Sequence, residues 1–205
     1  MLPGMTPTRL DSPRLVLASA SPRRLDLLRQ IGIEPAVVEA ADIDESPRGR
    51  ELPAMHARRL ALAKALAVRA RHPGEFVLAA DTVVACGRRI LPKATDAQVA
   101  RECLTLLSGR RHRVLGAVTL IGPDGRQTHR LVTTAVTFKR LSAEEMESYL
   151  ASGEWEGKAG GYAIQGRAAQ FVPQIVGSYS NVVGLPLYDT AAMLRGLGFI
   201  PGRTG

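Results

Sequence analysis

Residues 15–32 place a short apolar run directly before an amphipathic helix, and this pattern constrains the fold more than any other segment. Leu15 to Ala18 are all apolar, which predicts a buried strand. The apolar residues after the following turn recur at helical spacing. Ser21 is a typical helix cap, Pro22 suits a first helical turn, and Gly32 suits a helix end. The segment therefore predicts a strand followed at once by a helix, the unit from which α/β folds are built.

Two arginines, Arg23 and Arg24, stand where the free N–H groups of this helix already carry partial positive charge. A bound phosphate would explain them, because helix N-termini bind anions and arginine adds charge-assisted hydrogen bonds. Ser19 and Ser21 are two residues apart, so in an extended chain their hydroxyls point the same way. Both could join one anion site. A solvated pair of arginines is the alternative, and the spacing leaves both open.

Strand and helix patterns alternate through the first half of the chain and then give way to a hairpin. The expected strands are 34–40, one within 75–86 that runs into Asp81, and the two arms of 111–140, which meet at Asp124-Gly125, with a strand-like run after the glycine-rich residues 157–166. The expected helices are 53–71, 96–107 capped by Asp96, 142–152 capped by Ser142, and 186–197, with a loop at 41–52 and a turn at 87–94. This order predicts an α/β fold with a mixed, twisted sheet flanked by helices, in two lobes that enclose a central cleft. Residues 1–13 are expected to form a flexible tail, and 14–205 a single domain.

Composition excludes several classes of protein. No apolar run is long enough to span a membrane, and the N-terminus lacks the apolar segment of a signal peptide. Cys86 and Cys103 show no metal or redox spacing, which predicts a cytoplasmic protein with reduced thiols. The net charge of +8 favours an anionic ligand, but aromatic residues make up only 4% and no nucleic-acid motif occurs, so nucleic acid is not the expected partner. The histidines lack zinc spacing and are expected to be structural or on the surface: His56, His72, His112 and His129.

Asp81 is the first candidate for chemistry, because it follows an apolar strand. A carboxylate in such surroundings must be protonated, paired or bound to metal. Strand ends are also where α/β folds bind ligands. A structural aspartate that accepts backbone hydrogen bonds is the equal alternative. Lys64 lies on or beside the apolar stripe of the 53–71 helix, so its ammonium either reaches water or points into a site.

The loop before that helix carries a group of carboxylates, Asp42, Asp44 and Glu45. Such a group suits Mg²⁺, which takes one or two carboxylates and completes its shell with water and phosphate oxygens. An acidic loop exposed to water is the interpretation that the sequence alone favours.

Two further segments supply polar groups that could meet a ligand. Lys93 follows Asp81 in the next turn and is a candidate for neutralising charge, with a solvated loop lysine as the alternative. Residues 157–166 carry four glycines, which permit a close approach of the backbone to a ligand, together with Lys158 and Gln165. A flexible surface loop is the alternative there. The chain has neither of the common glycine-rich phosphate motifs.

Several motifs in order closely resemble the Maf family of nucleoside triphosphate pyrophosphatases, from about Leu15 to Leu197. They are LASASPRRLDLLRQIGI, DTVV, LPKATD, SGRRHRV, KAGGYAIQG and GSYSNVVGLPL. The resemblance implies one α/β catalytic domain with a cleft between two lobes. It also implies hydrolysis of a nucleoside triphosphate to the monophosphate and pyrophosphate, with a divalent metal such as Mg or Mn, and it leaves a homodimer open.

The resemblance also implies roles for individual residues. Asp81 matches the catalytic aspartate, either as the base that takes a proton from water or as a metal ligand. Glu45 matches the acidic residue of the loop and would share the metal. The residues that match substrate-binding positions are Ser19, Arg23, Arg24, Lys64, Thr82, Lys93, Lys158 and Gln165.

The combination of Arg23, Thr82 and Gln165 is similar to the family branch that acts on dTTP and UTP, and differs from the branch that acts on 7-methyl-GTP. Two stretches depart from the family pattern: Pro92-Lys93-Ala94 replaces G-K-P, and Leu115-Gly116-Ala117 replaces T-G-V. Other functions remain as alternatives. They are a non-catalytic nucleotide-binding regulator of cell division, a pyrophosphatase for 7-methyl-GTP or modified nucleotides, and a phosphatase that removes the terminal phosphate.

Overall fold

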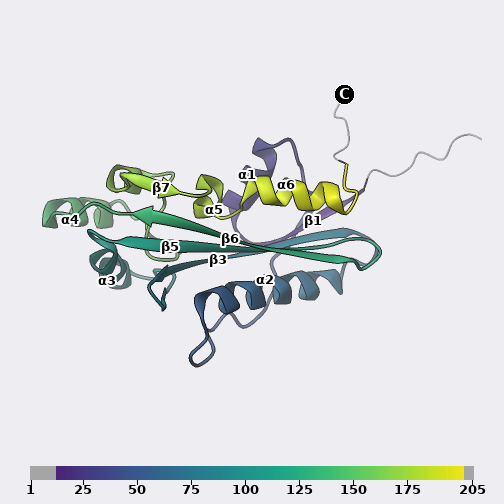
Figure 1. Cartoon of the computed structure of the whole chain (residues 1–205), viewed down its shortest axis with the longest axis horizontal. Coiled ribbons are helices and arrows are strands. Elements are labelled where there is room, and N and C mark those ends of the chain that lie inside the picture. The colour runs from purple at the N-terminus through teal and green to yellow at the C-terminus, as the bar shows by residue number, and fades with distance from the viewer. Residues whose placement is uncertain (1–12, 201–205) are drawn as a thin grey trace, which may run out of the picture.

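The computed structural model describes residues 13–200 and shows one mixed, seven-stranded sheet with helices on both faces (Figure 1). The strands are β1 Leu15–Ala18, β2 Val37–Val38, β3 Phe76–Cys86, β4 Arg89–Leu91, β5 Arg111–Ile121, β6 Gln127–Thr137 and β7 Gln174–Val176. The helices are α1 Pro22–Gln30, α2 Pro53–Arg69, α3 Ala97–Leu107, α4 Ala143–Ala151, the 3₁₀ segment η1 Arg167–Phe171, α5 Tyr179–Val183 and α6 Leu187–Gly196. The predicted α/β class is confirmed. Residues 1–12 of the predicted tail lie outside the described residues.

The pairing of β3 creates the feature that positions the site. The sheet order is β2-β1-β3-β5-β6-β7, with β4 also paired to β3. One edge of β3 pairs with β5 from Val77 to Ala85. The other edge pairs first with β1, up to Ala79, and again with β4 only from Val84 onward. Between these two partners the edge of β3 has a gap in the described sheet, and Asp81 and Thr82 lie in it.

Alternation along β3 sends these two neighbours to opposite faces of the sheet. Val77 and Val83 share one face with Asp81 and pack in apolar clusters with residues of α2. Leu78 shares the other face with Thr82 and belongs to the largest cluster, which includes residues of α1, α3, α4 and α6. Figure 1 shows α2 below the sheet and α1, α5 and α6 above it. A gap at the strand edge therefore lets side chains from both layers meet.

Helix caps were predicted with mixed success. Asp96 caps α3 and Ser142 caps α4, each through a side-chain hydrogen bond to a backbone N–H, so these two predictions are confirmed. Ser21 occupies the N-cap position of α1, but its hydroxyl makes no capping bond, so that prediction is wrong. Instead, the N–H of Ser21 donates to Oγ of Ser19 at 3.1 Å.

Several strand predictions need correction, because long-range pairing decides strand length. The strand predicted at 34–40 shrinks to β2, since the short β1 gives it few partners. Asp81 was expected near a strand end, yet it lies inside β3, which continues because β5 pairs alongside it. The turn predicted at 87–94 contains β4. The strand-like run after residue 166 begins as η1, and β7 follows it.

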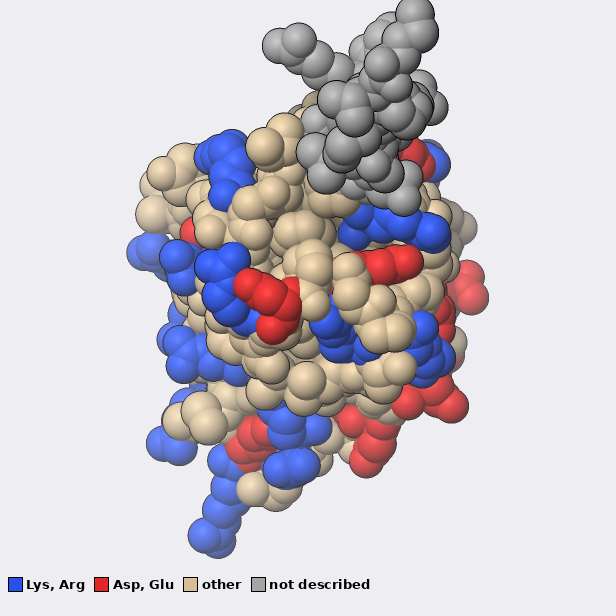
Figure 2. Space-filling view, turned by 90° about the vertical axis from the view of Figure 1, so that its right-hand side faces the viewer, with Lys and Arg blue, Asp and Glu red and all other residues tan. Residues whose placement is uncertain are grey.

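The surface mixes both signs of charge. Figure 2 shows Lys and Arg interspersed with Asp and Glu over one end of the molecule, although the net charge is +8. On this face the positive charge is spread out, and it does not gather into one continuous patch. Within residues 13–200, no helix is both long and apolar enough to cross a membrane.

Candidate active site

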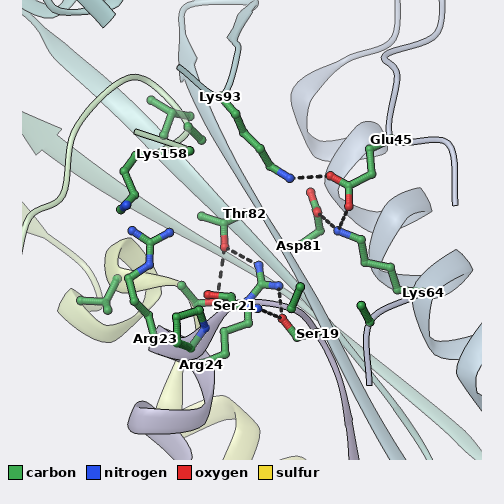
Figure 3. A pocket seen from close by; sticks show the side chains of 18 of the residues that line it. Ser19, Ser21, Arg23, Arg24, Glu45, Lys64, Asp81, Thr82, Lys93 and Lys158 are labelled. Carbon is green, nitrogen blue, oxygen red and sulfur yellow. Dashed lines mark hydrogen bonds and ion pairs between the residues drawn. The ribbon is translucent and has the colours of Figure 1, made fainter. Parts of the chain in front are cut away.

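A cavity of about 400 Å³ opens at the gap in the β3 edge. Its walls come from both halves of the chain: the β1–α1 turn, the loop before α2, β3, the glycine-rich segment and the end of α5 (Figure 3). The predicted site residues that line it are Ser19, Arg23, Arg24, Glu45, Lys64, Asp81, Thr82, Lys93 and Lys158. Ser21 lines it as well. Gln165 is exposed and is not among the lining residues.

Arg24 is held by neutral oxygen acceptors on three sides. Its Nε donates to the carbonyl of Gly184 at 2.9 Å, Nη1 to Oγ of Ser19 at 3.0 Å, and Nη2 to Oγ1 of Thr82 at 3.2 Å. The hydroxyl of Thr82 in turn donates to the Gly184 carbonyl at 3.3 Å. The side chain is buried, and burial lowers the pKa of Arg24, while the charge of Asp81 acts in the opposite direction. These contacts fix the guanidinium and leave two of its five N–H groups free to bind a ligand.

Arg23 and Lys158 extend this positive region. In Figure 3 their charged ends lie next to one another, away from Lys64 and Glu45. Burial lowers the pKa of Arg23, and burial together with the charge of Arg23 lowers the pKa of Lys158. Lys158 Nζ donates to the carbonyl of Glu156 at 2.7 Å. Across residues 13–200, none of Arg23, Arg24 and Lys158 forms an ion pair with a carboxylate. We call these three residues the cationic side of the cavity.

The opposite wall is a network of alternating charges. Lys64 Nζ lies 2.8 Å from Oδ1 of Asp81 and 2.7 Å from Oε1 of Glu45. The other oxygen of Glu45 lies 2.6 Å from Nζ of Lys93. Asp81 is therefore paired, and the ammonium of Lys64 points into the site. Two lysines face two carboxylates here, and we call these four residues the paired side.

Glu45 is the member of the acidic loop that reaches the cavity. Burial of its carboxyl favours the neutral form, but hydrogen bonds from Lys64 and Lys93 outweigh that effect and lower its pKa to about 2. Asp42 and Asp44 are exposed and do not line the cavity. The described residues hold no group of three or more His, Cys, Asp or Glu that could bind a metal ion without further ligands. Any cation here would therefore depend on oxygen atoms supplied by the substrate and water.

The glycine-rich segment is fastened to the turn that carries Lys93. The N–H of Ala94 donates to the carbonyl of Lys158 at 3.0 Å, a bond that the proline of the family pattern could not make. Gly160 has a φ of +70°, and a Cβ there would lie 2.9 Å from Cγ1 of Val84 on β3. A side chain at this position would thus be strained and crowded at once. These contacts join the segment to β3 and to the turn of Lys93, and it forms a wall of the cavity.

Two groups that support the site, the carbonyl of Gly184 and the side chain of Asn181, were not predicted from the sequence. The carbonyl of Gly184 orients both Arg24 and Thr82, yet a backbone oxygen has no sequence signature of its own. Asn181 is fully buried in α5, and its Nδ2 donates to the carbonyl of Val114 at 3.2 Å. A Cβ on Gly116, which pairs with Thr82 across the sheet, would lie only 1.8 Å from Oδ1 of Asn181. The motif that contains Asn181 and Gly184 was the available signal.

Comparison with known proteins relates the chain to one family. The family model described as Maf-like protein matches residues 14–197. A dTTP/UTP pyrophosphatase of Paramagnetospirillum magneticum is 71% identical over 187 residues, which covers 91% of this chain and 98% of that protein. A dTTP/UTP pyrophosphatase of Rhodospirillum rubrum is 63% identical over 198 residues, which covers 97% and 94%.

Among solved structures, that of a HAM1 protein from Coxiella burnetii covers 90% of this chain and 99% of that chain, with a TM-score of 0.50. At 16% sequence identity this similarity concerns the fold alone. The family model, by contrast, spans nearly all of the described residues. The order of the motifs, the cavity that they line and this match lead to one conclusion: the chain belongs to the Maf family.

Proposed function

We propose that this chain is a pyrophosphatase that hydrolyses dTTP and UTP to the nucleoside monophosphate and pyrophosphate. The names of relatives up to 71% identical support the substrate class. The observation that carries the proposal is the cavity itself, which is lined both by three cations that pair with no carboxylate of residues 13–200 and by the paired carboxylate of Asp81. A triphosphate would supply the negative charge that the three cations lack. It would also supply the phosphorus atom that a water activated by Asp81 attacks.

The cationic side would bind the phosphate chain. Arg24 is already oriented, and the N-terminus of α1 lies beside it, so donors and a favourable dipole point at the same space. Arg23 and Lys158 reach toward that space from opposite walls. Because burial removes hydration from these cations and no carboxylate of residues 13–200 forms an ion pair with them, a bound phosphate would supply the direct charged contact that they lack.

Asp81 would then act on the attacking water. The hydrogen bond to Lys64 uses Oδ1, which leaves Oδ2 as an acceptor for a proton of the water. The water oxygen forms a bond to the α-phosphorus, the bond from that phosphorus to the bridging oxygen breaks, and pyrophosphate leaves. Lys64 holds the carboxylate in one place, and Lys93 adds positive charge at the same wall. Positioning and electrostatics are the main contributions in phosphoryl transfer of this kind.

A divalent cation fits the donors of the paired side. Glu45 and Asp81 are hard oxygen ligands that meet at one ammonium, and Mg²⁺ is often held by two carboxylates while phosphate oxygens and water complete its shell. When bound, such an ion would offset charge that develops on the phosphate oxygens. The substrate-binding roles of Thr82 and Gln165, a homodimer and a cytoplasmic location stay predictions.

Product analysis tests the proposed function. Purified protein is given dTTP, UTP, the other canonical triphosphates, 7-methyl-GTP and modified pyrimidine triphosphates, each with Mg²⁺ or Mn²⁺. We expect pyrophosphate and the monophosphate, formed fastest from dTTP and UTP. Orthophosphate and a diphosphate would show a phosphatase instead. Faster turnover of 7-methyl-GTP than of dTTP and UTP would assign the chain to the family branch that acts on 7-methyl-GTP. Binding of nucleotides without turnover would indicate a non-catalytic regulator.

A further inference from the structure

The loop that carries Glu45 is clamped onto α2 by one arginine outside the cavity. Nε of Arg59 donates to Oε1 of Glu51 at 2.7 Å, and Nη2 donates to Oε2 at 2.8 Å, so the pair is bidentate. Nη2 also donates to the carbonyl of Ser46 at 3.0 Å. Ser46 directly follows Glu45 in the chain. One guanidinium on the helix therefore holds the loop at two points, one of them next to the site residue.

Glu51 is the centre of this clamp. Its side chain is only 9% exposed, although it lies in a surface loop. It accepts the N–H of Arg48 at 3.1 Å and lies 2.9 Å from Nδ1 of His56, in addition to both bonds from Arg59. Arg50, just before it, has a φ of +59°, which is uncommon for a residue other than glycine. This uncommon backbone conformation occurs directly before Glu51, whose side chain is turned away from solvent.

In the described chain one local bond spans Glu45: the N–H of Ser46 donates to Oδ1 of Asp44 at 2.9 Å. The loop around it has no helix or strand in the described chain, so no ladder of backbone hydrogen bonds holds its place. At its start the loop is tied to the end of α2, because Arg71 bonds to Glu39. Toward its end the loop is tied to α2 again by the Arg59 clamp. Each oxygen of Glu45 must nevertheless meet a separate lysine, at 2.7 Å and 2.6 Å.

We propose that Arg59 is a positioning residue, which acts through Glu51 and Ser46 to hold the carboxylate of Glu45 between Lys64 and Lys93. This inference rests on the proposed function for its kinetic part only. A bidentate arginine is suited to the task, because its planar fork fixes direction as well as distance. Neither Arg59 nor Glu51 lines the cavity, so a direct contact with substrate is not their role.

Three variants separate positioning from charge and from general stability. Arg59→Met removes the donors, while Arg59→Lys keeps the charge but cannot form the fork. Arg69→Met is the matched control. Arg69 lies on the same helix, bonds to three backbone carbonyls outside the loop that carries Glu45, and does not line the cavity. Thermal unfolding of all three variants measures any general loss of stability.

The kinetic test is a double-mutant cycle with Glu45→Gln. Removing a residue that orients a site group commonly costs about 10-fold or more in activity, so we expect Arg59→Met and Arg59→Lys each to lower kcat/KM for dTTP by about 10-fold. In the Glu45→Gln background the same changes should cost less than about 2-fold, because the group they position is already lost. Wild-type activity in Arg59→Lys, or fully additive losses in the cycle, would overturn the proposal.

Hydrogen exchange tests the clamp independently of activity. Amides of residues 45–51 should exchange on the order of 10-fold faster in Arg59→Met and Arg59→Lys than in wild type, and should not change in Arg69→Met. Unchanged exchange in the Arg59 variants would overturn the proposal. If wild-type protein shows no turnover while exchange still rises in the Arg59 variants, the proposed function fails and the clamp stands.

Discussion

The two sides of the cavity handle charge in opposite ways. On the paired side, Lys64 and Lys93 meet Glu45 and Asp81 at 2.6–2.8 Å, and the positive and negative charges balance. On the cationic side, Arg24 bonds to a carbonyl and two hydroxyls, which carry no charge. Lys64 lies on α2 below the sheet and the two arginines lie on α1 above it, so the two sides meet where the edge of β3 is open.

Because their charges are paired differently, the two sides are expected to have different tasks: the cationic side binds the substrate and the paired side carries out the chemistry. Buried cations with neutral partners are costly in the free protein and favourable once an anion arrives. A balanced network gains little from an additional phosphate, but it holds a carboxylate at a fixed position. We therefore expect substitutions on the cationic side to change affinity, and substitutions on the paired side to change turnover.

The largest effect is expected at Asp81. Asp81→Asn removes the proton acceptor and should lower kcat for dTTP by about 1,000-fold, within the range of general-base catalysis. Lys64 keeps Glu45 as a partner at 2.7 Å, so no buried charge is left alone and the melting temperature should change little. Steady-state kinetics and thermal unfolding measure both. Asp26→Asn, at an exposed position on α1, is the control, and full activity of Asp81→Asn would remove Asp81 from the mechanism.

Lys158 tests the other side. Lys158→Met removes one charge that faces Arg23, and the loss of a hydrogen bond to a charged group, about 1.5–3 kcal/mol, predicts a rise in KM for dTTP of about 10-fold or more. The value of kcat should change much less. Lys139→Met, which loses an exposed pair with Glu145 outside the cavity, is the control. A fall in kcat at constant KM would place Lys158 with the chemistry and remove the distinction between the two sides.

A substitution at Gly116 tests the packing of Asn181 and α5, which precede the Gly184 carbonyl that orients Arg24. Gly116→Ala places a Cβ 1.8 Å from Oδ1 of Asn181, so the buried asparagine and α5 must move. Overpacking of this kind costs about 1–3 kcal/mol in the free energy of unfolding, measured in urea. Gly196→Ala, where a Cβ meets nothing within 4 Å, should not destabilise the protein. Equal stability of the two variants would show that the contact with Asn181 is not tight.

The smallest effect concerns the pH dependence of stability. Burial of Glu45 opposes ionisation, but the bonds from Lys64 and Lys93 prevail and lower its pKa from the ordinary 4.5 to about 2. A lowered pKa in the folded state stabilises the protein above pH 4.5, and this contribution disappears as the pH falls toward 2. The difference in unfolding free energy between wild type and Glu45→Gln should thus shrink from pH 6 to pH 3. Partial exposure keeps it small, and a difference that grows on acidification would contradict the ion pairs.

The sequence predicted those elements whose structure depends on neighbouring residues in the chain. The strand and helix of residues 15–32 form as expected, because apolar periodicity and Pro22 act within one segment. The cap at Ser21 failed because the N–H of Arg24, which a capping hydroxyl would bind, donates to the backbone carbonyl of Ser21 at 3.2 Å. The acidic loop was expected to face water, and two of its carboxylates do so, while Glu45 turns toward Lys64.

Long-range pairing decides the rest of the site. The gap at Asp81 exists only because β1 ends early and β4 begins late along the same edge of β3. No pattern within β3 indicates this. The sequence left two orientations open for Lys64, toward water or into a site. Its ion pair with Asp81 shows that the ammonium points into the site. The Arg59 clamp was missed because its partners, Glu51 and Ser46, lie in a loop without periodicity.

Equilibrium binding of a non-hydrolysable triphosphate tests the central claim, the division between a binding side and a chemical side, most directly. Calorimetry with α,β-imido-dUTP in metal-free buffer compares wild type, Asp81→Asn and Arg23→Met. Asp81→Asn should bind at least as tightly as wild type, because it removes a negative charge, and Arg23→Met should bind about 10-fold more weakly. Unchanged binding by Arg23→Met, or an equal loss in Asp81→Asn, would contradict the account.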